Sequence, residues 1–232
     1  MIADSSLPGE WAWLGVVPYG RGMAIQDNVR NQIAEGRAVD TLLLLEHQSV
    51  ITLGRSADSA NIVASAEDLG RAGIAVAHTS RGGDVTYHGP GQLVGYPVFR
   101  LRRGVRAHVK AMADGIIAAL ATLGIEAEWH ESRPGVWVGA EKICAVGVHV
   151  RRRVATHGFA LNVNTDLSAF RTIVPCGLRD AGVTSIAKLL GTAFELENVA
   201  GRLVHALERS FFLRLKQISA SSSRLQIANE NL

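Results

Sequence analysis

An α+β domain, built on a mixed and largely antiparallel sheet with flanking helices, is the fold class that the sequence predicts. Apolar segments at residues 125–129, 135–138, 142–150 and 154–163 follow one another with connections short enough for hairpins, which favours antiparallel pairing. Amphipathic segments with helical periodicity precede and follow this run. Such helices bury their apolar faces against a sheet, and this packing defines the class.

The first half of the chain adds shorter elements. Apolar runs predict strands at residues 11–17, 41–46, 50–54 and 74–78, because each run is shorter than an ordinary helix. A helix is predicted at residues 21–35, with Ala24, Ile25, Val29 and Ile33 on its core side, and a short helix at residues 66–72.

The clearest helix of the sequence follows Pro97. Apolar residues recur there at spacings of three and four, namely Val109, Met112, Ile116, Leu120 and Leu123, and Gly124 ends the run. A short helix is predicted at residues 184–190. Thr192 and Glu195 then predict a capping box for a long last helix, whose core side carries Leu196, Val199, Leu203, Leu207 and Phe211.

Length and composition limit the class of protein. The chain has 232 residues, 47% of them hydrophobic and 19% charged, with a mean hydropathy of +0.15. We expect one domain at residues 1–218 and a disordered polar tail at residues 219–232. No apolar run approaches the length of a membrane span, and no signal peptide is evident. We therefore expect a cytoplasmic protein without membrane contact, in which Cys144 and Cys176 are free thiols.

The net charge is +3 and the pI is about 9.1. Part of the positive charge is clustered in Arg100, Arg102, Arg103, Arg106 and Lys110, and again in Arg151, Arg152 and Arg153. An acidic protein, a nucleic acid or solvent alone would suit such a surface. Because no nucleic-acid-binding motif accompanies the arginines, we expect no nucleic-acid partner.

A glycine-rich stretch occupies residues 81–97 and reads R-G-G-D-V-T-Y-H-G-P-G-Q-L-V-G-Y-P. Glycine allows positive φ angles and close approach of the backbone to a bound group. The residues alone fit two interpretations, contact with a ligand or a plain turn between strands at 85–87 and 93–96.

Two cysteines and a lysine are candidates for covalent chemistry. Cys176 lies between Pro175 and Gly177, where a thiol can be exposed and backed by backbone N–H groups that lower its pKa. The alternative is a small buried hydrophobic residue. Cys144 lies in an apolar strand, and we expect it to be structural. Lys142 opens the same strand, and a lysine there either reaches water or has a partner.

The histidines give no sign of a metal site. None of the eight occurs in a ligand spacing such as H-E-x-x-H, and the chain has no G-x-x-x-x-G-K-[ST] loop for phosphates. We therefore expect neither a metal nor a P-loop nucleotide site.

Several segments match a known family in order along the chain. The first is R-G-G-x-x-T-Y-H-G-P-G-Q-x-x-x-Y-P at residues 81–97. Further matches are L-L-E-H at 44–47, T-L-G-R at 52–55, G-V-W-V at 135–138, K-I at 142–143, H-G-F-A-L-N-V at 157–163, I-V-P-C-G-L at 173–178 and G-V-T-S at 182–185. Together they resemble the lipoyl(octanoyl) transferases. Gln48 and Ser49 depart from the family, which more often has two prolines there. The difference affects the expected shape of that loop and not the expected chemistry.

The resemblance implies a fold shared with biotin and lipoate protein ligases, and it assigns roles to residues. Cys176 would be the catalytic nucleophile and Lys142 its acid–base partner. His157 is expected to be a structural support, and Phe159 or a neighbour to close the acyl channel. The expected substrate-binding residues are Arg81, Gly82, Gly83, Asp84, Val85, Thr86, Tyr87, His88, Ala145, Val146, Gly147, Gly158, Phe159 and Ala160.

The activity that the resemblance implies is transfer of an octanoyl group from octanoyl-acyl carrier protein to a specific lysine of a lipoyl domain, through a thioester on the cysteine. The acceptors would be the E2 subunits of 2-oxoacid dehydrogenases and the glycine cleavage H protein. No ATP and no metal are expected, because the donor arrives activated, and we expect a monomer. The alternatives are an ATP-dependent lipoate or biotin protein ligase on the same fold, and a non-catalytic module that binds partners through its arginines.

Overall fold

The structure, a computed structural model, describes residues 6–174 and 182–227. Its described strands form a sheet of nine strands and a sheet of three, where the sequence predicted one sheet. The larger has the order β12-β1-β2-β6-β10-β9-β8-β7, and β11 also pairs with β9. Its strands are β1 (Leu7–Val17), β2 (Asp40–His47), β6 (Gln92–Val98), β7 (Glu128–Trp129), β8 (Val136–Val138), β9 (Glu141–Arg151), β10 (Val154–Asn162), β11 (Gly182–Val183) and β12 (Leu213–Gln217).

The pairing of the larger sheet is mixed. Strand β1 runs parallel to both β2 and β12, and β11 runs parallel to β9, whereas the other neighbours are antiparallel. Parallel neighbours need a crossover, which α1 (Tyr19–Ala34) provides between β1 and β2. The predicted fold class is therefore confirmed.

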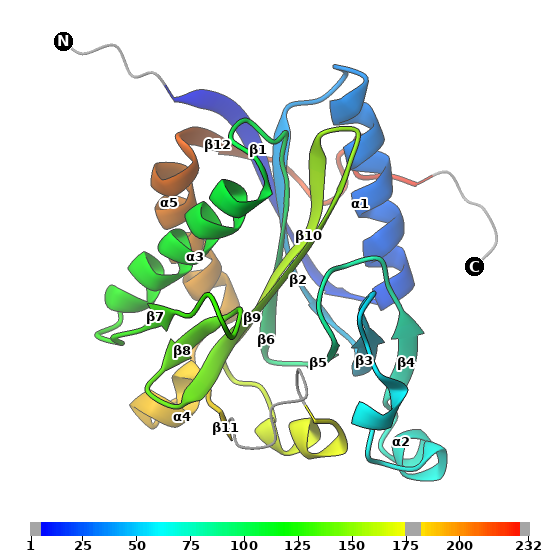
Figure 1. Cartoon of the computed structure of the whole chain (residues 1–232). Helices are drawn as coiled ribbons and strands as arrows, with labels where there is room; N and C mark the ends of the chain where they lie inside the picture. Colours follow the sequence, from blue (N-terminus) through cyan, green and yellow to red (C-terminus); the bar gives the residue numbers. More distant parts are fainter. Residues whose placement is uncertain (1–5, 175–181, 228–232) are drawn as a thin grey trace.

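Different helices cover the two faces of this sheet (Figure 1). Helices α3 (Val105–Ala121) and α5 (Leu196–Phe211) pack on one face, and α1 packs on the other. Successive side chains of a strand point to opposite faces. Accordingly, Leu42 and Leu44 of β2 join the core beside α3 and α5, and Leu43 joins the core beside α1. Burial on both sides explains why this strand is a continuous apolar run.

The smaller sheet has the order β4-β3-β5. Strand β3 (Val50–Leu53) runs parallel to β4 (Ala75–His78) and antiparallel to β5 (Val85–His88). Residues of this sheet share a separate core with residues 66–71 and 167–172, which form a short α-helix and a 3₁₀ helix. The remaining elements are α2 (Ala66–Arg71), α4 (Ile186–Leu190), η1 (Ser59–Asn61) and η2 (Leu167–Thr172).

Two local predictions differ from the structure. Glu195 is itself the N-cap of α5, and no cap side chain makes a hydrogen bond there, so the predicted capping box is wrong. Thr192 lies too far before Leu196 to reach the first free N–H groups of the helix. The strand predicted at residues 125–129 is limited to Glu128–Trp129, because Ile125 is buried in the core beside α3.

Part of the expected tail packs on the domain. Leu225 is buried, and the side-chain amide of Asn28 in α1 donates to the carbonyls of Arg224 (3.2 Å) and Gln226 (2.8 Å). Arg224 also forms an ion pair with Glu10 of β1. Residues 224–226, which belong to the tail for which we expected disorder, thus lie against α1 and β1. None of the described helices is long and apolar enough to cross a membrane.

Candidate active site

A pocket lies between the two sheets, beside the glycine-rich stretch. Its walls come from the loop before β5, from β5 itself, and from β6, β9 and β10 of the larger sheet. Lys142 lines the pocket. So do all the residues that we expected to bind substrate, apart from Tyr87: Arg81, Gly82, Gly83, Asp84, Val85, Thr86, His88, Ala145, Val146, Gly147, Gly158, Phe159 and Ala160. The structure therefore brings three separate sequence segments to one cavity.

Several glycines around the pocket are required by close packing. A Cβ atom on Gly54 would lie 2.2 Å from the carbonyl oxygen of Gly83, and one on Gly158 would lie 2.2 Å from that of Gly95. A Cβ on Gly95 would lie 2.1 Å from Cζ of Phe159. No side chain fits at such distances. The glycines let backbone and ring approach one another at the walls, which a plain turn would not need.

Tyr87 points away from the pocket. Its ring packs edge-on against Phe170, with the centroids 5.6 Å apart, and its hydroxyl lies 3.1 Å from Oγ of Ser49. Its neighbours in β5, Thr86 and His88, line the pocket. Alternation along the strand places Tyr87 in the core of the smaller sheet.

Lys142 is buried at the start of β9, with 7% of its surface exposed. Its ammonium lies 4.9 Å from the ring centroid of Trp137, a favourable arrangement of a cation and an aromatic face. Its stem passes Gly135, where a Cβ would lie 2.9 Å from Cε of Lys142. A buried ammonium in a pocket wall is well placed to interact with a thiolate or a reacting carbonyl.

Cys176 lies outside the described residues, but the chain on both sides of residues 175–181 is tied to the pocket. The carboxylate of Asp84 accepts a hydrogen bond from the Asn61 side chain (2.6 Å), and the Asn61 carbonyl accepts one from Val174 N–H (2.7 Å). After the segment, Val183 pairs with Lys142 and lines the pocket. The described residues on either side, Val174 and Val183, are thus linked to Asp84 and Lys142.

Cys144 occupies a different environment. It has no exposed surface, belongs to the core beside α3, and donates a weak hydrogen bond to the Ala145 carbonyl (3.5 Å). Burial raises the pKa of its thiol, and the charge of Lys142 offsets this only in part. A thiol that resists ionisation is a poor nucleophile, which agrees with the structural role expected for Cys144.

His88 is held in one neutral form. The Gln92 side-chain amide donates to the Tyr87 carbonyl (3.1 Å) and to Oδ1 of Asn162 (2.9 Å), so its oxygen accepts from Nδ1 of His88 (2.8 Å). Nε2 is then the unprotonated nitrogen. Burial, with smaller effects of His47 and of the Arg81 charge, lowers the pKa of His88 to about 3. At neutral pH this ring can accept a hydrogen bond in the pocket, but it carries no charge.

The same hydrogen bonds continue to Lys142. The Asn162 side chain donates to the Thr184 carbonyl (3.0 Å), and Thr184 N–H donates to the Lys142 carbonyl (3.0 Å). Gln92 and Asn162 also line the pocket. Sequence reasoning gave them no role, although both stand in the motifs that we matched, T-Y-H-G-P-G-Q and H-G-F-A-L-N. A polar residue inside a buried glycine-rich motif was the signal that could have found them.

Arg81 holds the smaller sheet against the pocket. Its guanidinium donates to the Thr52 carbonyl (2.7 Å) and to the Thr52 hydroxyl (2.8 Å). The hydroxyl lies 3.5 Å from Nε2 of His88. Because Arg81 can only donate, the hydroxyl proton of Thr52 is directed toward His88.

The remaining polar lining consists of Tyr19, Tyr96 and His157, none of which was predicted to bind substrate. The Tyr96 hydroxyl is hydrogen-bonded to the buried His47, whose Nε2 lies 2.6 Å away. Nδ1 of His47 lies 2.7 Å from the Val17 carbonyl. The His157 ring meets Oγ of Ser80 (3.1 Å), so His157 supports the loop before β5 and also faces the pocket. Burial lowers the pKa of His47 to about 4 and that of His157 to about 3.

Comparison with known proteins identifies the family. Residues 18–208 match the model of the lipoyl protein ligase A/B catalytic domain. The chain is 51% identical over 201 residues to the octanoyltransferase of Solibacter usitatus, covering 85% of this chain and 90% of that protein. This chain belongs to the octanoyltransferase family.

A second octanoyltransferase, from Myxococcus xanthus, is 50% identical over 195 residues, covering 80% of this chain and 55% of that longer protein. Among solved structures, a lipoate-protein ligase A bound with ATP aligns with a TM-score of 0.79 at 18% identity, covering 94% of this chain and 91% of that one. At this identity the likeness concerns the fold, and it agrees with the fold implied by the sequence.

As a member of the octanoyltransferases, the chain is an acyltransferase that acts in protein lipoylation. Its pocket combines apolar walls, such as Val85, Val146 and Phe159, with a buried ammonium at Lys142. An acyl chain can bury its methylenes against the apolar walls. Within residues 6–174 and 182–227, no group of three or more His, Cys, Asp or Glu side chains is arranged to hold a metal ion.

Proposed function

We propose that this enzyme takes an octanoyl group from octanoyl-acyl carrier protein, holds it as a thioester on Cys176, and passes it to a specific lysine of a lipoyl domain. One observation carries the proposal. The buried Lys142 ammonium lies in the wall of the pocket. The chain before residues 175–181 is linked through Asn61 to the pocket residue Asp84, and the chain after them pairs with Lys142.

In the first half-reaction the thiolate of Cys176 attacks the carbonyl carbon of the donor thioester. A new S–C bond forms, and the bond to the carrier's sulfur breaks. Lys142 donates a proton to the departing thiolate, which leaves as a neutral thiol, and the lysine becomes a neutral amine. The ammonium stabilises the Cys176 thiolate beforehand.

In the second half-reaction the neutral ε-amine of the acceptor lysine attacks the Cys176 thioester. The C–N bond of the amide forms, the C–S bond breaks, and Lys142 takes the proton that the attacking nitrogen loses. The Cys176 thiolate and the Lys142 ammonium are then restored together. Exchange of one thioester for another is nearly balanced in free energy, whereas the amide makes the second step favourable.

We infer that the acceptors are the lipoyl domains of 2-oxoacid dehydrogenase E2 subunits and the glycine cleavage H protein. The reaction needs neither ATP nor a metal, because the donor is already an activated ester. A ligase of the same fold would instead activate a free acid as an adenylate, with no role for Cys176.

The test is to mix the protein with octanoyl-acyl carrier protein and a lipoyl domain in the absence of ATP, and to follow intact masses. We expect one octanoyl adduct on the enzyme at Cys176, followed by one on the lipoyl domain. Cys176→Ser should abolish both, whereas Cys144→Ser should retain most of the activity. An adduct at Cys144, or transfer that requires ATP and free octanoate, would contradict the proposal.

A further inference from the structure

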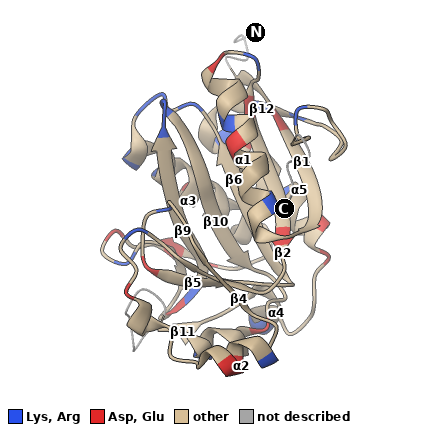
Figure 2. Ribbon diagram, turned by 90° about the vertical axis from the view of Figure 1, so that its right-hand side faces the viewer, with Lys and Arg blue, Asp and Glu red and all other residues tan. Residues whose placement is uncertain are grey.

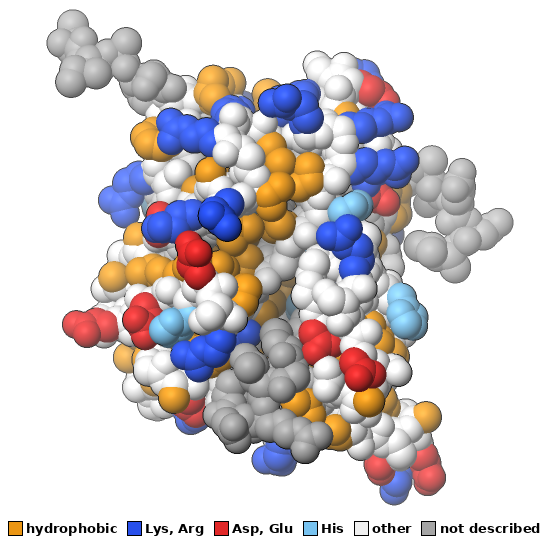
Figure 3. Space-filling view, viewed as in Figure 1, with side chains coloured by type: hydrophobic (Ala, Val, Ile, Leu, Met, Phe, Trp, Pro, Cys, Tyr) orange, Lys and Arg blue, Asp and Glu red, His pale blue; other side chains and the backbone are white. Residues whose placement is uncertain are grey.

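The end of the molecule where α3 begins presents a cluster of cations. Two segments some fifty residues apart meet there, the turn between β9 and β10 and the loop between β6 and α3 (Figure 1). We call their exposed arginines the arginine surface: Arg103, Arg106, Arg151, Arg152 and Arg153. In Figure 2 the ribbon is blue, the colour of Lys and Arg, where β9 turns into β10. In the upper part of the face in Figure 3, Lys and Arg side chains outnumber the acidic ones.

Backbone hydrogen bonds hold the two segments together. Leu101 N–H donates to the Arg153 carbonyl (2.8 Å), and Ala155 N–H donates to the Phe99 carbonyl (2.9 Å). Arg100 also forms a bridge with Val154. The two basic clusters that are separate in the sequence are therefore parts of one fixed surface.

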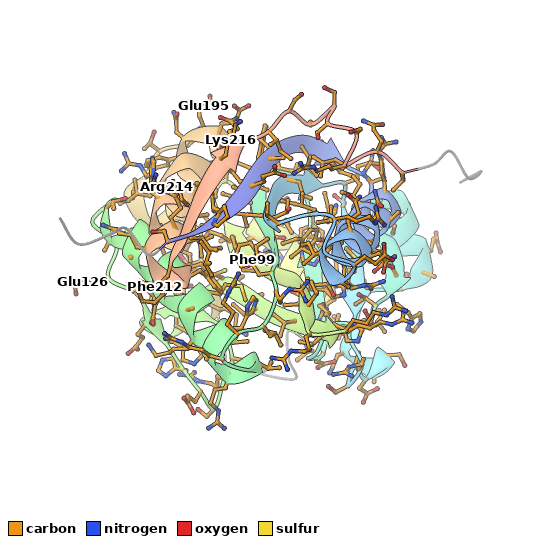
Figure 4. All side chains as sticks on the ribbon, turned by 90° about the horizontal axis from the view of Figure 1, so that it is seen from above. Phe99, Glu126, Glu195, Phe212, Arg214 and Lys216 are labelled. Carbon is orange, nitrogen blue, oxygen red and sulfur yellow. The ribbon has the colours of Figure 1, made fainter. Side chains whose placement is uncertain are left out.

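The backbone of this surface adopts conformations that ordinary side chains avoid. Arg152 and Arg153 have φ angles of 52° and 61°, as in the two-residue hairpin turns that usually contain Asn-Gly. Phe212, at the junction of α5 and β12 (Figure 4), has a φ of 56° and is 61% exposed. The left-handed region costs roughly 1–2 kcal/mol for a residue with a Cβ. A turn chosen only for stability would not place two arginines there.

The charges of this surface are only partly neutralised. Arg102, at its edge, pairs with Asp40 (2.6 Å), and the guanidinium of Arg103 lies 5.6 Å from the ring centroid of Phe212. The ion pairs found among the described residues include no acidic partner for Arg106, Arg151, Arg152 or Arg153. Exposed Arg and aromatic side chains are the types that dominate binding energy at protein interfaces.

We propose that the arginine surface docks the carrier protein that delivers the octanoyl group, through an acidic face of that protein. The proposal rests on the function proposed above. Strained, exposed arginines without acidic partners fit a surface kept for association, where positive charge attracts an acidic protein and orients it.

The position of the surface favours the acyl donor over the lysine acceptor. From Arg151, β9 extends over roughly 13 Å to the pocket residue Gly147 and over roughly 30 Å to Lys142. A donor that carries its acyl group on a long flexible arm can dock over this span, and the arm then brings the thioester into the pocket. An acceptor lysine reaches only the length of its four-carbon side chain, so the lipoyl domain has to dock at the pocket itself.

The experiment replaces the turn with its more stable equivalent, Arg152→Asn/Arg153→Gly. This variant removes two charges and suits a turn with two positive φ angles, so its melting temperature should not fall. We expect KM for octanoyl-acyl carrier protein to rise at least tenfold, with kcat little changed and with a weaker dependence of the rate on salt. Rates with octanoyl-pantetheine, a thioester without the protein, should equal those of the wild type.

The matched control is Arg71→Ala/Arg202→Ala, which removes the same charge from exposed sites on α2 and α5. It should leave KM for octanoyl-acyl carrier protein within twofold of the wild type. An unchanged KM for octanoyl-acyl carrier protein in the turn variant, or a rise in KM for the lipoyl domain instead, would overturn the docking proposal.

Failure of the proposed function gives a different result. In that case the wild type forms no acyl-enzyme from octanoyl-pantetheine or from octanoyl-acyl carrier protein. Binding of the carrier protein alone, followed by fluorescence anisotropy, would still test the surface. Loss of binding in the turn variant but not in the control supports docking, and equal binding by all three proteins refutes it.

Discussion

The two ends of the β9–β10 hairpin handle polar groups in opposite ways. At the pocket end, the side chains of His88, Gln92 and Asn162 are buried, and each has defined hydrogen-bond partners. At the turn end, Arg152 and Arg153 are exposed, and the ion pairs found among the described residues include neither of them. Buried polar groups depend on their neighbours, whereas exposed charges cost little to the fold. Changes at the pocket end should therefore alter chemistry and stability, and changes at the turn end should alter association.

Non-glycine residues with positive φ occur at both ends, and within the described chain they are Arg152, Arg153, His157 and Phe212. At the pocket, the strained residue is compensated by contacts, since His157 N–H donates to Oε1 of Gln26 (2.7 Å) and its ring meets Ser80. At the turn, no comparable side-chain contact of Arg152 is found in the described structure. Strain that persists without such compensation points to a role outside the fold.

The largest effect is expected at Lys142. Lys142→Arg keeps a positive charge near Trp137, but arginine does not exchange a proton in the neutral pH range. We expect kcat to fall at least a hundredfold, in the range usual for loss of a general acid–base. Single-turnover rates should fall equally with octanoyl-acyl carrier protein and with octanoyl-pantetheine. If the rate fell only with the carrier-protein donor, Lys142 would act in docking. Chemistry would then not be confined to the pocket end, nor association to the turn end.

Asn162 tests whether the pocket end depends on its hydrogen bonds. Asn162→Leu leaves the Gln92 amide and the buried Thr184 carbonyl each without one partner. We expect a loss of about 2–4 kcal/mol in the free energy of unfolding, measured by urea titration. The exposed Asn198 of α5 serves as control, and Asn198→Leu should change stability by less than about 0.5 kcal/mol. Equal effects of the two substitutions would mean that the buried hydrogen bonds of Asn162 contribute no more to stability than an amide on the surface does.

The buried histidines predict a dependence of stability on pH. His47 titrates at a pKa of about 4 in the folded protein, against about 6.5 when unfolded. As pH falls from 6.5 toward 4, the unfolded chain binds the proton and the folded chain does not. Each such histidine then lowers the free energy of unfolding by about 1.4 kcal/mol per pH unit, and above pH 7 the effect is absent.

For the measurement we propose His47→Gln, whose amide can still donate to the Val17 carbonyl and accept from the Tyr96 hydroxyl. Urea titrations between pH 7 and pH 4 give the free energy of unfolding at each pH. In this variant it should fall less steeply with decreasing pH than in the wild type, and the difference should correspond to about one proton. His205 is exposed on α5, and His205→Gln is the matched control. If both variants keep the slope of the wild type, His47 is not the buried neutral group that the structure describes.

The smallest effect concerns the length of the acyl chain. Phe159 is buried in the pocket wall against Gly95, and we expect its ring to limit the channel. Phe159→Ala should raise the rate with a decanoyl donor relative to octanoyl, by up to about fourfold for each of its two added methylenes. Ratios within one variant cancel any loss of folded protein. If the wild type already accepts the decanoyl donor equally well, the closed channel is refuted.

Much of the site could be located from sequence because its residues stand in contiguous, glycine-rich motifs. The stretch from Arg81 to His88 and the segments around Gly147 and Gly158 all reach the pocket, as expected, although the chemistry of Cys176 stays a prediction. Tyr87 shows that a residue within such a motif does not always reach the pocket. A strand turns alternate residues to opposite sides, and only the fold decides which side faces the pocket.

The hydrogen-bonded chain from His88 to Lys142 could not be predicted, because its members are far apart in sequence. Gln92 and Asn162 are polar residues in apolar strands, and their partners depend on how β6 pairs with β10. The meeting of the two arginine clusters likewise depends on the contact between Leu101 and Arg153. Tyr19 was missed because nothing near it in the chain marks a pocket. Tyr96 belongs to the glycine-rich stretch, but it was assigned only to the strand at residues 93–96.

The sequence by itself determined the fold class, the family and the residues whose chemistry suits acyl transfer, because apolar periodicity and short motifs are local properties of the chain. Only the tertiary structure decided which polar groups are hydrogen-bonded to one another, which tyrosine lies in the core and which arginines form one surface. Those outcomes depend on strand register and on contacts between distant segments. Burial then fixes the energetics, since the pKa of His88 or Cys144 follows from the groups around it and not from its neighbours in the sequence.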